Sequence, residues 1–206
     1  MRLLITAGPT REPLDPVRFL SNASSGKLGY AIAAQAARRG HQVELVSGPV
    51  DLDAPKGVKV THVVTGREMF DACVSVFARC DAAIMAAAVC DYRPRRAAPR
   101  KLHRDKGLML SLVATKDICA HLGRTKGDRI VVGFALEDRK ARSRAAEKLA
   151  RKRCDAIVLN RPDNIGAERA AVRFLLAEGG WQKPIAGSKP YIAGSLVDLV
   201  EKLVAR

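Results

Sequence analysis

The residues best suited to chemistry lie near the start of the chain, where they could form a cradle for an anion. A short apolar run at residues 3–5 leads to Gly8, and an alanine-rich helix is expected from about Ser25. Backbone amides in the first turn of a helix have no partners within the helix, and the helix dipole favours negative charge there. Small or hydroxyl-bearing residues surround this point: Gly8, Ser24, Ser25, Gly26 and Gly29. The pattern predicts a binding site for a nucleotide or a phosphate.

The spacing of these glycines differs from that of the dinucleotide-binding fingerprint. In that fingerprint, G-x-G-x-x-G, the glycines follow the strand directly, whereas a long insert separates Gly8 from Gly26 here. The insert holds Asp15 between two prolines, then Arg18 and Asn22, so it is polar and stiff. Loops between a strand and the next helix are usually short, and a long one indicates a functional role. A plain surface loop followed by a helix cap is the alternative.

Composition predicts one α/β domain, residues 1–206, that attracts polyanions. The chain is 48% hydrophobic, which is enough for a proper core at this length. Its 36 basic and 21 acidic residues give a net charge of +15, which suits nucleic acid or phosphorylated small molecules. Aromatic residues make up only 4%, which argues against a surface that stacks on bases.

Cysteine and histidine usage argues against a disulfide framework or a zinc site. The five cysteines include no C-x-x-C pair, and the four histidines are scattered. We therefore expect a reducing, cytoplasmic compartment. We also expect neither a signal peptide nor a membrane span, because the apolar runs are short and the first of them begins at once.

Apolar runs alternate with helical patterns along the chain, and this alternation predicts a doubly wound sheet. The expected strands cover residues 3–5, 41–47, 58–64, 81–89, 107–114, 129–136 and 155–160. The expected helices cover residues 26–39, 65–79, 115–122, 139–153 and 188–205. Thr65 and Glu68 form a capping box, Gly40 is expected to end the first helix, and Thr115 is expected to cap the third. Residues 172–185 predict a hairpin before the last helix.

Two basic features could meet a ligand. Residues 90–106 are rich in arginine and broken by prolines, which predicts an exposed flap after a central strand, where open α/β sheets bind ligands. A disordered basic linker is the alternative. Lys148 and Lys152 lie four residues apart and therefore on one helix face. A merely solvated lysine pair is the alternative there.

Several of these motifs together resemble the signature of phosphopantothenate–cysteine ligase. The resemblance rests on residues 7–18 (AGPTREPLDPVR), 21–22 (SN), 24–29 (SSGKLG), 86–92 (AAAVCDY), Lys101, 132–134 (VGF) and the pair Lys148 and Lys152, in the family's order. It covers nearly the whole chain. It implies a Rossmann-like, mostly parallel sheet with a basic flap and a C-terminal hairpin and helix, in a usually dimeric enzyme of coenzyme A biosynthesis. In bacteria this domain is often fused behind a flavin-dependent decarboxylase, so we expect a free-standing ligase or an excised domain with a functional link to such an enzyme.

The resemblance also implies a two-step reaction. The carboxylate of 4′-phosphopantothenate attacks the α-phosphate of CTP to give an acyl-cytidylate and pyrophosphate. The amine of L-cysteine then displaces CMP and forms the amide. Such chemistry needs charge stabilisation on a triphosphate and orientation of two anions. Mg²⁺ would share the phosphate charge; we name no metal-ligating residue.

Site residues follow by resemblance. Asn22 would orient the reacting carboxyl by donating from its amide, Arg18 would hold the intermediate or a substrate anion, and Lys101 would close over the triphosphate. The expected nucleotide-binding residues are Gly8, Ser24, Ser25, Gly26, Met85, Ala86, Ala87, Asp91, Lys101, Lys116, Asp117, Ile118, Cys119, Phe134, Lys148 and Lys152. Asp91 is expected on the ribose or base, and Lys116 to Cys119 with Phe134 around the cytosine.

Three departures from the family pattern affect details. Cys90 replaces the usual alanine, Lys116 stands where proline is common, and residues 166–171 lack the usual Asp and Asn. Preference for CTP over ATP therefore stays open.

Three other functions fit the sequence less well. A nicotinamide oxidoreductase would need an acid at the end of the second strand, where residues 47–49 read Ser-Gly-Pro. Specific nucleic-acid binding has only the net charge in its favour. A non-catalytic nucleotide-binding homologue is disfavoured by the intact set of Asn22, Arg18, Lys101 and the lysine pair.

Overall fold

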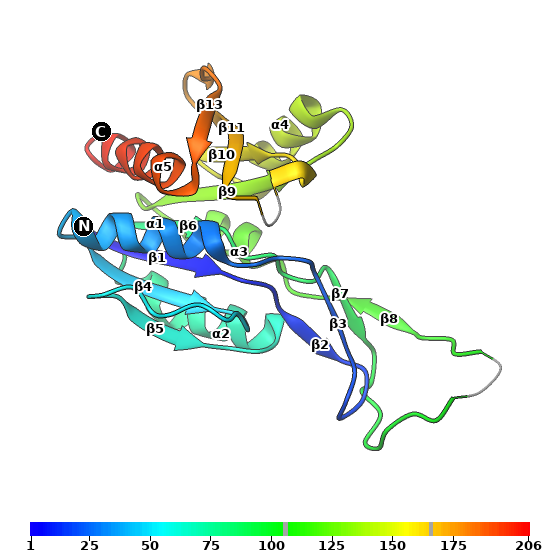
Figure 1. Cartoon of the computed structure of the whole chain (residues 1–206). Coiled ribbons are helices and arrows are strands. Elements are labelled where there is room, and N and C mark those ends of the chain that lie inside the picture. Colours follow the sequence, from blue (N-terminus) through cyan, green and yellow to red (C-terminus); the bar gives the residue numbers. More distant parts are fainter. Residues whose placement is uncertain (105–106, 165–166) are drawn as a thin grey trace.

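A mostly parallel sheet forms the centre of the molecule (Figure 1). The computed structural model describes residues 1–104, 107–164 and 167–206. The parallel strands lie in the spatial order β5 (Lys59–His62), β4 (Gln42–Ser47), β1 (Arg2–Ala7), β6 (Ala82–Met85), β9 (Ile130–Leu136) and β10 (Ala156–Asn160). This is the doubly wound order of a Rossmann-like sheet, and it reverses between β1 and β6. A crevice is therefore expected at the carboxyl ends of these two strands.

Antiparallel strands extend the sheet beyond β10. The strand β11 (Arg169–Leu176) pairs with β10 and also with β12 (Gly180–Trp181) and β13 (Ile185–Ser188). A short 3-10 turn, η1 (Pro162–Asn164), joins β10 to this part of the sheet. The hairpin predicted over residues 172–185 is thus confirmed, and its strands run somewhat further in both directions.

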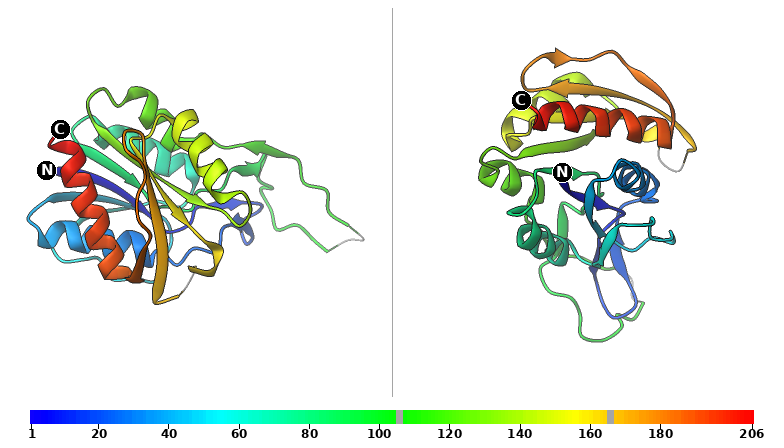
Figure 2. Two further views of the ribbon diagram at one scale, coloured as in Figure 1. Left: turned by 90° about the horizontal axis from the view of Figure 1, so that it is seen from above. Right: turned by 90° about the vertical axis from the view of Figure 1, so that its left-hand side faces the viewer.

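Helices cover both faces of the sheet (Figure 2). The helices α1 (Lys27–Arg38) and α5 (Lys189–Val204) pack on one face, and α2 (Gly66–Phe77), α3 (Ile118–Thr125) and α4 (Ala141–Lys152) on the other. Successive side chains of β1 point to opposite faces of the sheet. Leu3 and Ile5 therefore join the apolar core under α1 and α5, and Leu4 joins the core under α2, α3 and α4. Among the described residues, no helix combines the length and apolar character needed to cross a membrane.

Local signals in the sequence located most helix ends. The capping box of Thr65 and Glu68 is present, and Gly40 has a φ of 80° just past α1. The cap predicted at Thr115 is wrong: Asp117 caps α3 by accepting a hydrogen bond of 3.0 Å from the amide of Ala120. The Thr115 hydroxyl instead donates to the carbonyl oxygen of Cys90 at 2.6 Å. Both residues are good caps, and tertiary structure decides between them.

The strand predicted over residues 81–89 is much shorter than expected. Only Ala82–Met85 pair in the sheet, and the chain then leaves it. The amide of Ala87 donates to Thr6 Oγ1 at 3.1 Å, and the amide of Ala88 donates to the carbonyl oxygen of Gly8 at 2.9 Å. The apolar run therefore continues as a loop fastened to the end of β1.

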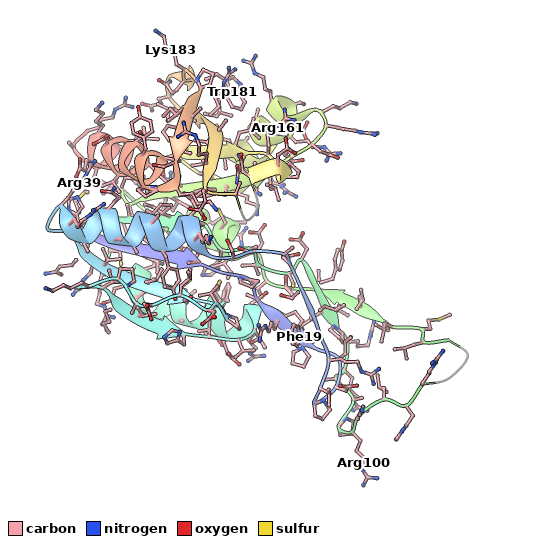
Figure 3. The ribbon with its side chains drawn as sticks, in the orientation of Figure 1. Phe19, Arg39, Arg100, Arg161, Trp181 and Lys183 are labelled. Atoms are coloured by element: carbon pink, nitrogen blue, oxygen red, sulfur yellow. The ribbon has the colours of Figure 1, made fainter. Side chains whose placement is uncertain are left out.

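Two hairpins project from the same side of the body, and together we call them the arm (Figure 1). One pairs β2 (Arg11–Pro13) with β3 (Phe19–Ser21), and the other pairs β7 (Tyr92–Pro94) with β8 (Leu112–Ala114). The sequence predicted loops for residues 9–24 and 90–106 and a strand over 107–114, so only part of the second hairpin was foreseen. Arg100 lies towards the outer end of the arm and Phe19 nearer the body (Figure 3).

Two buried carboxylates hold the arm together. Asp15 accepts hydrogen bonds from the amides of Val17 (2.8 Å) and Arg18 (2.8 Å) and from that of Leu102 (3.1 Å) on the second hairpin. Burial by itself would raise the pKa of Asp15, but these amides and the Arg18 guanidinium hold it well below its usual range. Glu12, 2% exposed, accepts from the amide of Gly66 at 2.7 Å and fastens the base of the arm to α2.

The start of α1 lies unusually close to β1. A Cβ placed on Gly29 would lie 2.5 Å from Ala7 Cβ and 3.1 Å from the Thr6 carbonyl oxygen. The absence of a side chain at Gly29 is therefore required for the packing of helix on strand. This contact brings the first turn of α1 to the carboxyl end of β1.

Gly29→Ala is expected to destabilise the fold. Alanine gains at most about 1 kcal/mol in helix propensity over glycine, whereas overpacking against backbone that cannot rotate away costs about 1–3 kcal/mol. Urea denaturation should therefore show a lower free energy of unfolding. The matched control is Gly107→Ala, which has no neighbour within 4 Å of the new methyl group. An equal or higher stability of the Gly29 variant would contradict the close packing.

Candidate functional site

A cavity of about 610 Å³ lies at the crevice where the strand order reverses. It is bounded by the first turn of α1, the loop after β6, the ends of β9 and β10, and one face of α4. Among the residues expected to bind nucleotide or to act in catalysis, those that line it are Asn22, Ser24, Ser25, Gly26, Met85, Ala86, Ala87, Asp91, Cys119, Phe134, Lys148 and Lys152. Residues distant in the sequence thus meet in one place.

The first turn of α1 forms the predicted amide cradle. Gly26, with a φ of 72°, precedes the helix, and no side chain caps it. Its own amide makes only a long contact of 3.4 Å with Ser24 Oγ. In the described residues no acceptor is bonded to the amides of Lys27, Leu28 or Gly29. An anion in the cavity can take these donors.

Gly8 does not line the cavity but packs against Gly26, which begins the amide cradle. A Cβ on Gly26 would lie 3.4 Å from Gly8 Cα and 2.7 Å from Val50 Cγ1. Both glycines have positive φ values, so a larger residue at either position would be strained as well as crowded.

Asn22 is held by the loop after β6. Its amide nitrogen donates to the carbonyl oxygens of Ala88 (3.0 Å) and Val89 (3.1 Å). Both amide protons are therefore used within the described structure, and the carbonyl oxygen is the group left for a ligand. The expected role as a donor stays a prediction and would require one of these bonds to be exchanged on binding.

Lys148 and Lys152 form a cationic wall on α4, opposite the cradle. Burial, together with the positive charge of Lys152, lowers the pKa of Lys148. The Lys152 ammonium pairs with Asp117 at 3.1 Å. Burial alone would raise the pKa of Asp117, but the Ala120 amide and Lys152 lower it. Lys148 is thus the member of the pair more available to a bound anion.

The wall near α4 also carries a pair of thiols. Cys119 Sγ lies 3.4 Å from Cys154 Sγ, and both sulfur atoms pack against the Cβ position of Gly133. A hydrogen bond from Cys154 lowers the pKa of Cys119 despite its burial, and the same contact, with burial, raises the pKa of Cys154. With Phe134 and Met85, Cys119 gives this part of the cavity a less polar lining suited to a base.

Other expected site residues lie outside the cavity. Arg18 is in the arm, paired with Asp15 at 2.7 Å and donating to the Leu102 carbonyl oxygen, and Lys101 is exposed on the same arm. The Lys116 ammonium lies over the Phe70 ring at 4.4 Å, and Ile118 is buried in the core. Within residues 116–119, only Cys119 lines the cavity. The helix α3 begins at Ile118, whose side chain is buried in the core.

Several lining residues were not foreseen: Lys27, Glu137, Asn160, Asn164 and Lys189. Glu137 and Asn160 could have been found, because each stands at the carboxyl end of a parallel strand. Asn164 bonds back to Asn160 and to Ala171 at 2.9 Å. Nothing local singles out Lys189. Of the divergent residues 166–171, Gly166 lies outside the described residues, and Ala170 lines the cavity.

The carboxylates of the cavity do not form a metal site by themselves. Among the described residues, no three His, Cys, Asp or Glu side chains are grouped so that they could hold an ion. Asp91 and Glu137 line the cavity, and Glu137 pairs with Arg144 at 3.1 Å. Such a donor set suits a magnesium ion that arrives on substrate phosphates, since Mg²⁺ commonly keeps several waters and few protein ligands.

Comparison with known proteins relates the chain to curated relatives. A family model described as the DNA/pantothenate metabolism flavoprotein C-terminal domain matches residues 1–204. A cysteine/cysteine sulfinic acid decarboxylase from an unknown prokaryotic organism is 46% identical over 169 residues, covering 81% of this chain and 47% of that protein. The coenzyme A biosynthesis bifunctional protein CoaBC of Bacillus subtilis (strain 168) is 45% identical over 160 residues, covering 77% of this chain and 39% of that protein.

A solved structure matches over almost the whole chain. The crystal structure of the C-terminal domain of CoaBC superimposes with a TM-score of 0.85 and 35% identity, covering 99% of this chain and 95% of that one. The chain thus spans less than half of each of the two curated relatives but nearly all of this separate domain. It belongs to the family of DNA/pantothenate metabolism flavoprotein C-terminal domains.

Proposed function

We propose that this chain is a ligase domain that joins 4′-phosphopantothenate to L-cysteine at the expense of CTP. The observation that carries the proposal is a single cavity with an amide cradle, an oriented Asn22 and a lysine wall. The 35% identity to the C-terminal domain of a coenzyme A biosynthesis protein supports the same reading. A functional link to a decarboxylase would match the bifunctional name of the Bacillus subtilis relative.

The reaction would proceed through an acyl-cytidylate. The amides of α1 would hold phosphate oxygens, and the less polar wall of Cys119 and Phe134 would receive the base. Lys148 would stabilise charge that develops on the α-phosphate during the attack. Asn22 would place the acyl group beside the α-phosphate, and its carbonyl oxygen would accept a hydrogen bond from the amine of cysteine in the second step. Mg²⁺ bound with CTP would neutralise part of the triphosphate charge.

The residue at the carboxyl end of β4 argues against a nicotinamide-dependent oxidoreductase. Ser47 ends this strand, is buried, accepts from the Tyr30 hydroxyl at 3.0 Å and donates to the carbonyl oxygen of Gly48 at 2.9 Å. A ribose of that cofactor would need a carboxylate at this position. The Ser47 hydroxyl instead bonds to Tyr30 and so helps to hold α1 against the sheet.

The arm suits a homodimer. Large apolar side chains are exposed on it: Val17, Phe19, Tyr92, Leu108, Met109, Leu110 and Leu112. Such a gathering of exposed apolar groups is typical of an interface. Because Lys101 and Arg18 lie on the arm and do not line the cavity, they would reach the triphosphate and the substrate anion, respectively, by arm closure or by reaching into a second subunit.

The ligase activity can be tested by pyrophosphate release. Wild-type protein with CTP, Mg²⁺, 4′-phosphopantothenate and L-cysteine should release pyrophosphate and form the amide. Asn22→Asp should lose about a hundredfold or more in rate, because the new carboxylate faces the Ala88 and Val89 carbonyl oxygens and repels anionic substrates. Thermal unfolding serves as the control for folding. A folded wild type that releases no pyrophosphate with either CTP or ATP refutes the proposal.

The lowered pKa of Lys148 predicts an alkaline limit on nucleotide affinity. The anion favours the charged ammonium, so affinity should be constant below the pKa of Lys148 and fall as pH rises through it. That fall begins below the ordinary lysine value of about 10.4. Calorimetric titration of CTP against pH measures it. Lys148→Arg keeps the charge to higher pH and should move the limit upwards; an unchanged profile would assign it to another group.

The proposed dimer can be tested on the arm itself. Met109, 97% exposed, is changed to Asp together with Leu108→Ser. Light scattering should show a dimer for the wild type and a monomer for the double variant. Val74→Ser, which removes an exposed apolar side chain of α2 outside the arm, is the matched control. A wild-type monomer at micromolar concentration would count against the dimer.

A further inference from the structure

A lysine from the C-terminal helix is buried at the cavity. Lys189 is the first residue of α5, is 7% exposed and lines the cavity together with Lys27 of α1. Lysine side chains are seldom buried to this extent without a partner. Its position therefore requires an explanation that helix capping alone does not give.

The backbone at the start of α5 has little to offer a ligand. The Lys189 amide donates to the carbonyl oxygen of Glu168 at 3.3 Å, Pro190 has no amide proton, and the Tyr191 amide donates to Ser188 Oγ at 3.4 Å. All donors of this first turn are accounted for. The side-chain ammonium of Lys189 is the remaining donor at this end of the helix.

The nearest carboxylate is engaged by another lysine. Glu168 pairs with Lys27 at 2.8 Å, and this pairing lowers the pKa of Glu168. In the described part of the chain, no hydrogen bond or ion pair joins the Lys189 ammonium to another residue. Burial and the positive charge of Lys27 both lower the pKa of Lys189. Glu168 partly offsets these effects, but because it pairs with Lys27 it leaves the Lys189 ammonium, which lines the cavity, free to bond an anion there.

The packing of α5 on α1 fixes this ammonium relative to the amide cradle. Gln35 donates to the carbonyl oxygen of Pro190 at 3.0 Å, and Arg39 donates to that of Gly194 at 3.2 Å. The two helices therefore run in the same direction, and both begin at the end of the sheet nearer the arm (Figure 1). In the cavity wall, Lys189 lies near Lys27 in the first turn of α1, and Lys148 lies near Cys119.

We propose that Lys189 is a polyphosphate-binding residue, which holds the terminal phosphates of the nucleoside triphosphate while the cradle of α1 holds those nearer the nucleoside. This assignment rests on the proposed function for the identity of the nucleotide. The anion class itself follows from the two sets of donors, the free amides of α1 and the Lys189 ammonium, that line one cavity. The α-phosphate would then lie between the terminal phosphates and the base, near Asn22.

Binding measurements with Lys189→Met test the proposal. The affinity for CTP and for inorganic triphosphate, measured by calorimetry, should fall by about tenfold to a hundredfold, as when a hydrogen bond between charged groups is lost. The affinity for CMP, which lacks the terminal phosphates, should change by less than about twofold, because no contact of that size is lost. Thermal unfolding should show little loss of stability, since no ion pair of the Lys189 ammonium is removed in the described part of the chain. Lys189→Arg should retain more of the triphosphate affinity than Lys189→Met.

The matched control is Lys202→Met, which removes the same charge from the exposed far end of α5. It corrects for the general attraction of a protein with a net charge of +15. Equal losses for CTP and CMP, or no loss beyond this control, would overturn the assignment. Inorganic triphosphate separates the two proposals, because a selective loss of its binding in a protein without ligase activity supports Lys189 and refutes only the reaction.

Discussion

The close approach of α1 to β1 is the constraint on which the site depends. Ala7 occupies the space where Gly29 would carry a Cβ, and Gly26 rests against Gly8 one turn earlier. Because the helix is pressed onto the strand at its first turn, its unpaired amides open at the carboxyl end of β1. The same point is where the strand order reverses and neighbouring loops diverge. The cavity is thus a consequence of how a helix and a strand pack, before any ligand is considered.

The arm is built on a different principle, since polar groups hold it together. Asp15 links its two hairpins through backbone amides, and Glu12 links its base to α2. A carboxylate that accepts several amide protons fixes loop geometry more narrowly than apolar contacts can. This leaves the large apolar side chains of the arm facing outwards. Rigidity within the arm and exposed apolar groups on its surface together suit a partner-binding element.

The sequence predicted the fold better than the site's details. Buried strands flanked by glycine or proline, and the capping box at Thr65, carry local signals that tertiary structure does not override. The strands β2, β3 and β7 of the arm were missed because short polar strands that pair across a loop leave no periodic pattern. Asp117 replaced Thr115 as a cap because the Thr115 hydroxyl is bonded to Cys90. Asn22 and the lysine pair line the cavity, and their roles there stay predictions. Which atoms of Asn22 are left for a ligand depends on its bonds to Ala88 and Val89.

Lys189 shows most clearly why part of a site lies beyond sequence reasoning. A lysine at the start of a helix looks like an exposed residue placed unfavourably for the helix dipole. Only the packing of α5 beside α1 brings it into the cavity, where Glu168 is already bonded to Lys27. The charged form of Lys189 is disfavoured in the free protein by burial and by Lys27. A bound anion would relieve this effect, so the same position favours anion binding. Lys148, half-buried and beside a second lysine, follows the same logic on α4. Two lysines with lowered pKa values, brought to one cavity by two different helices, fit a polyanion better than a single phosphate.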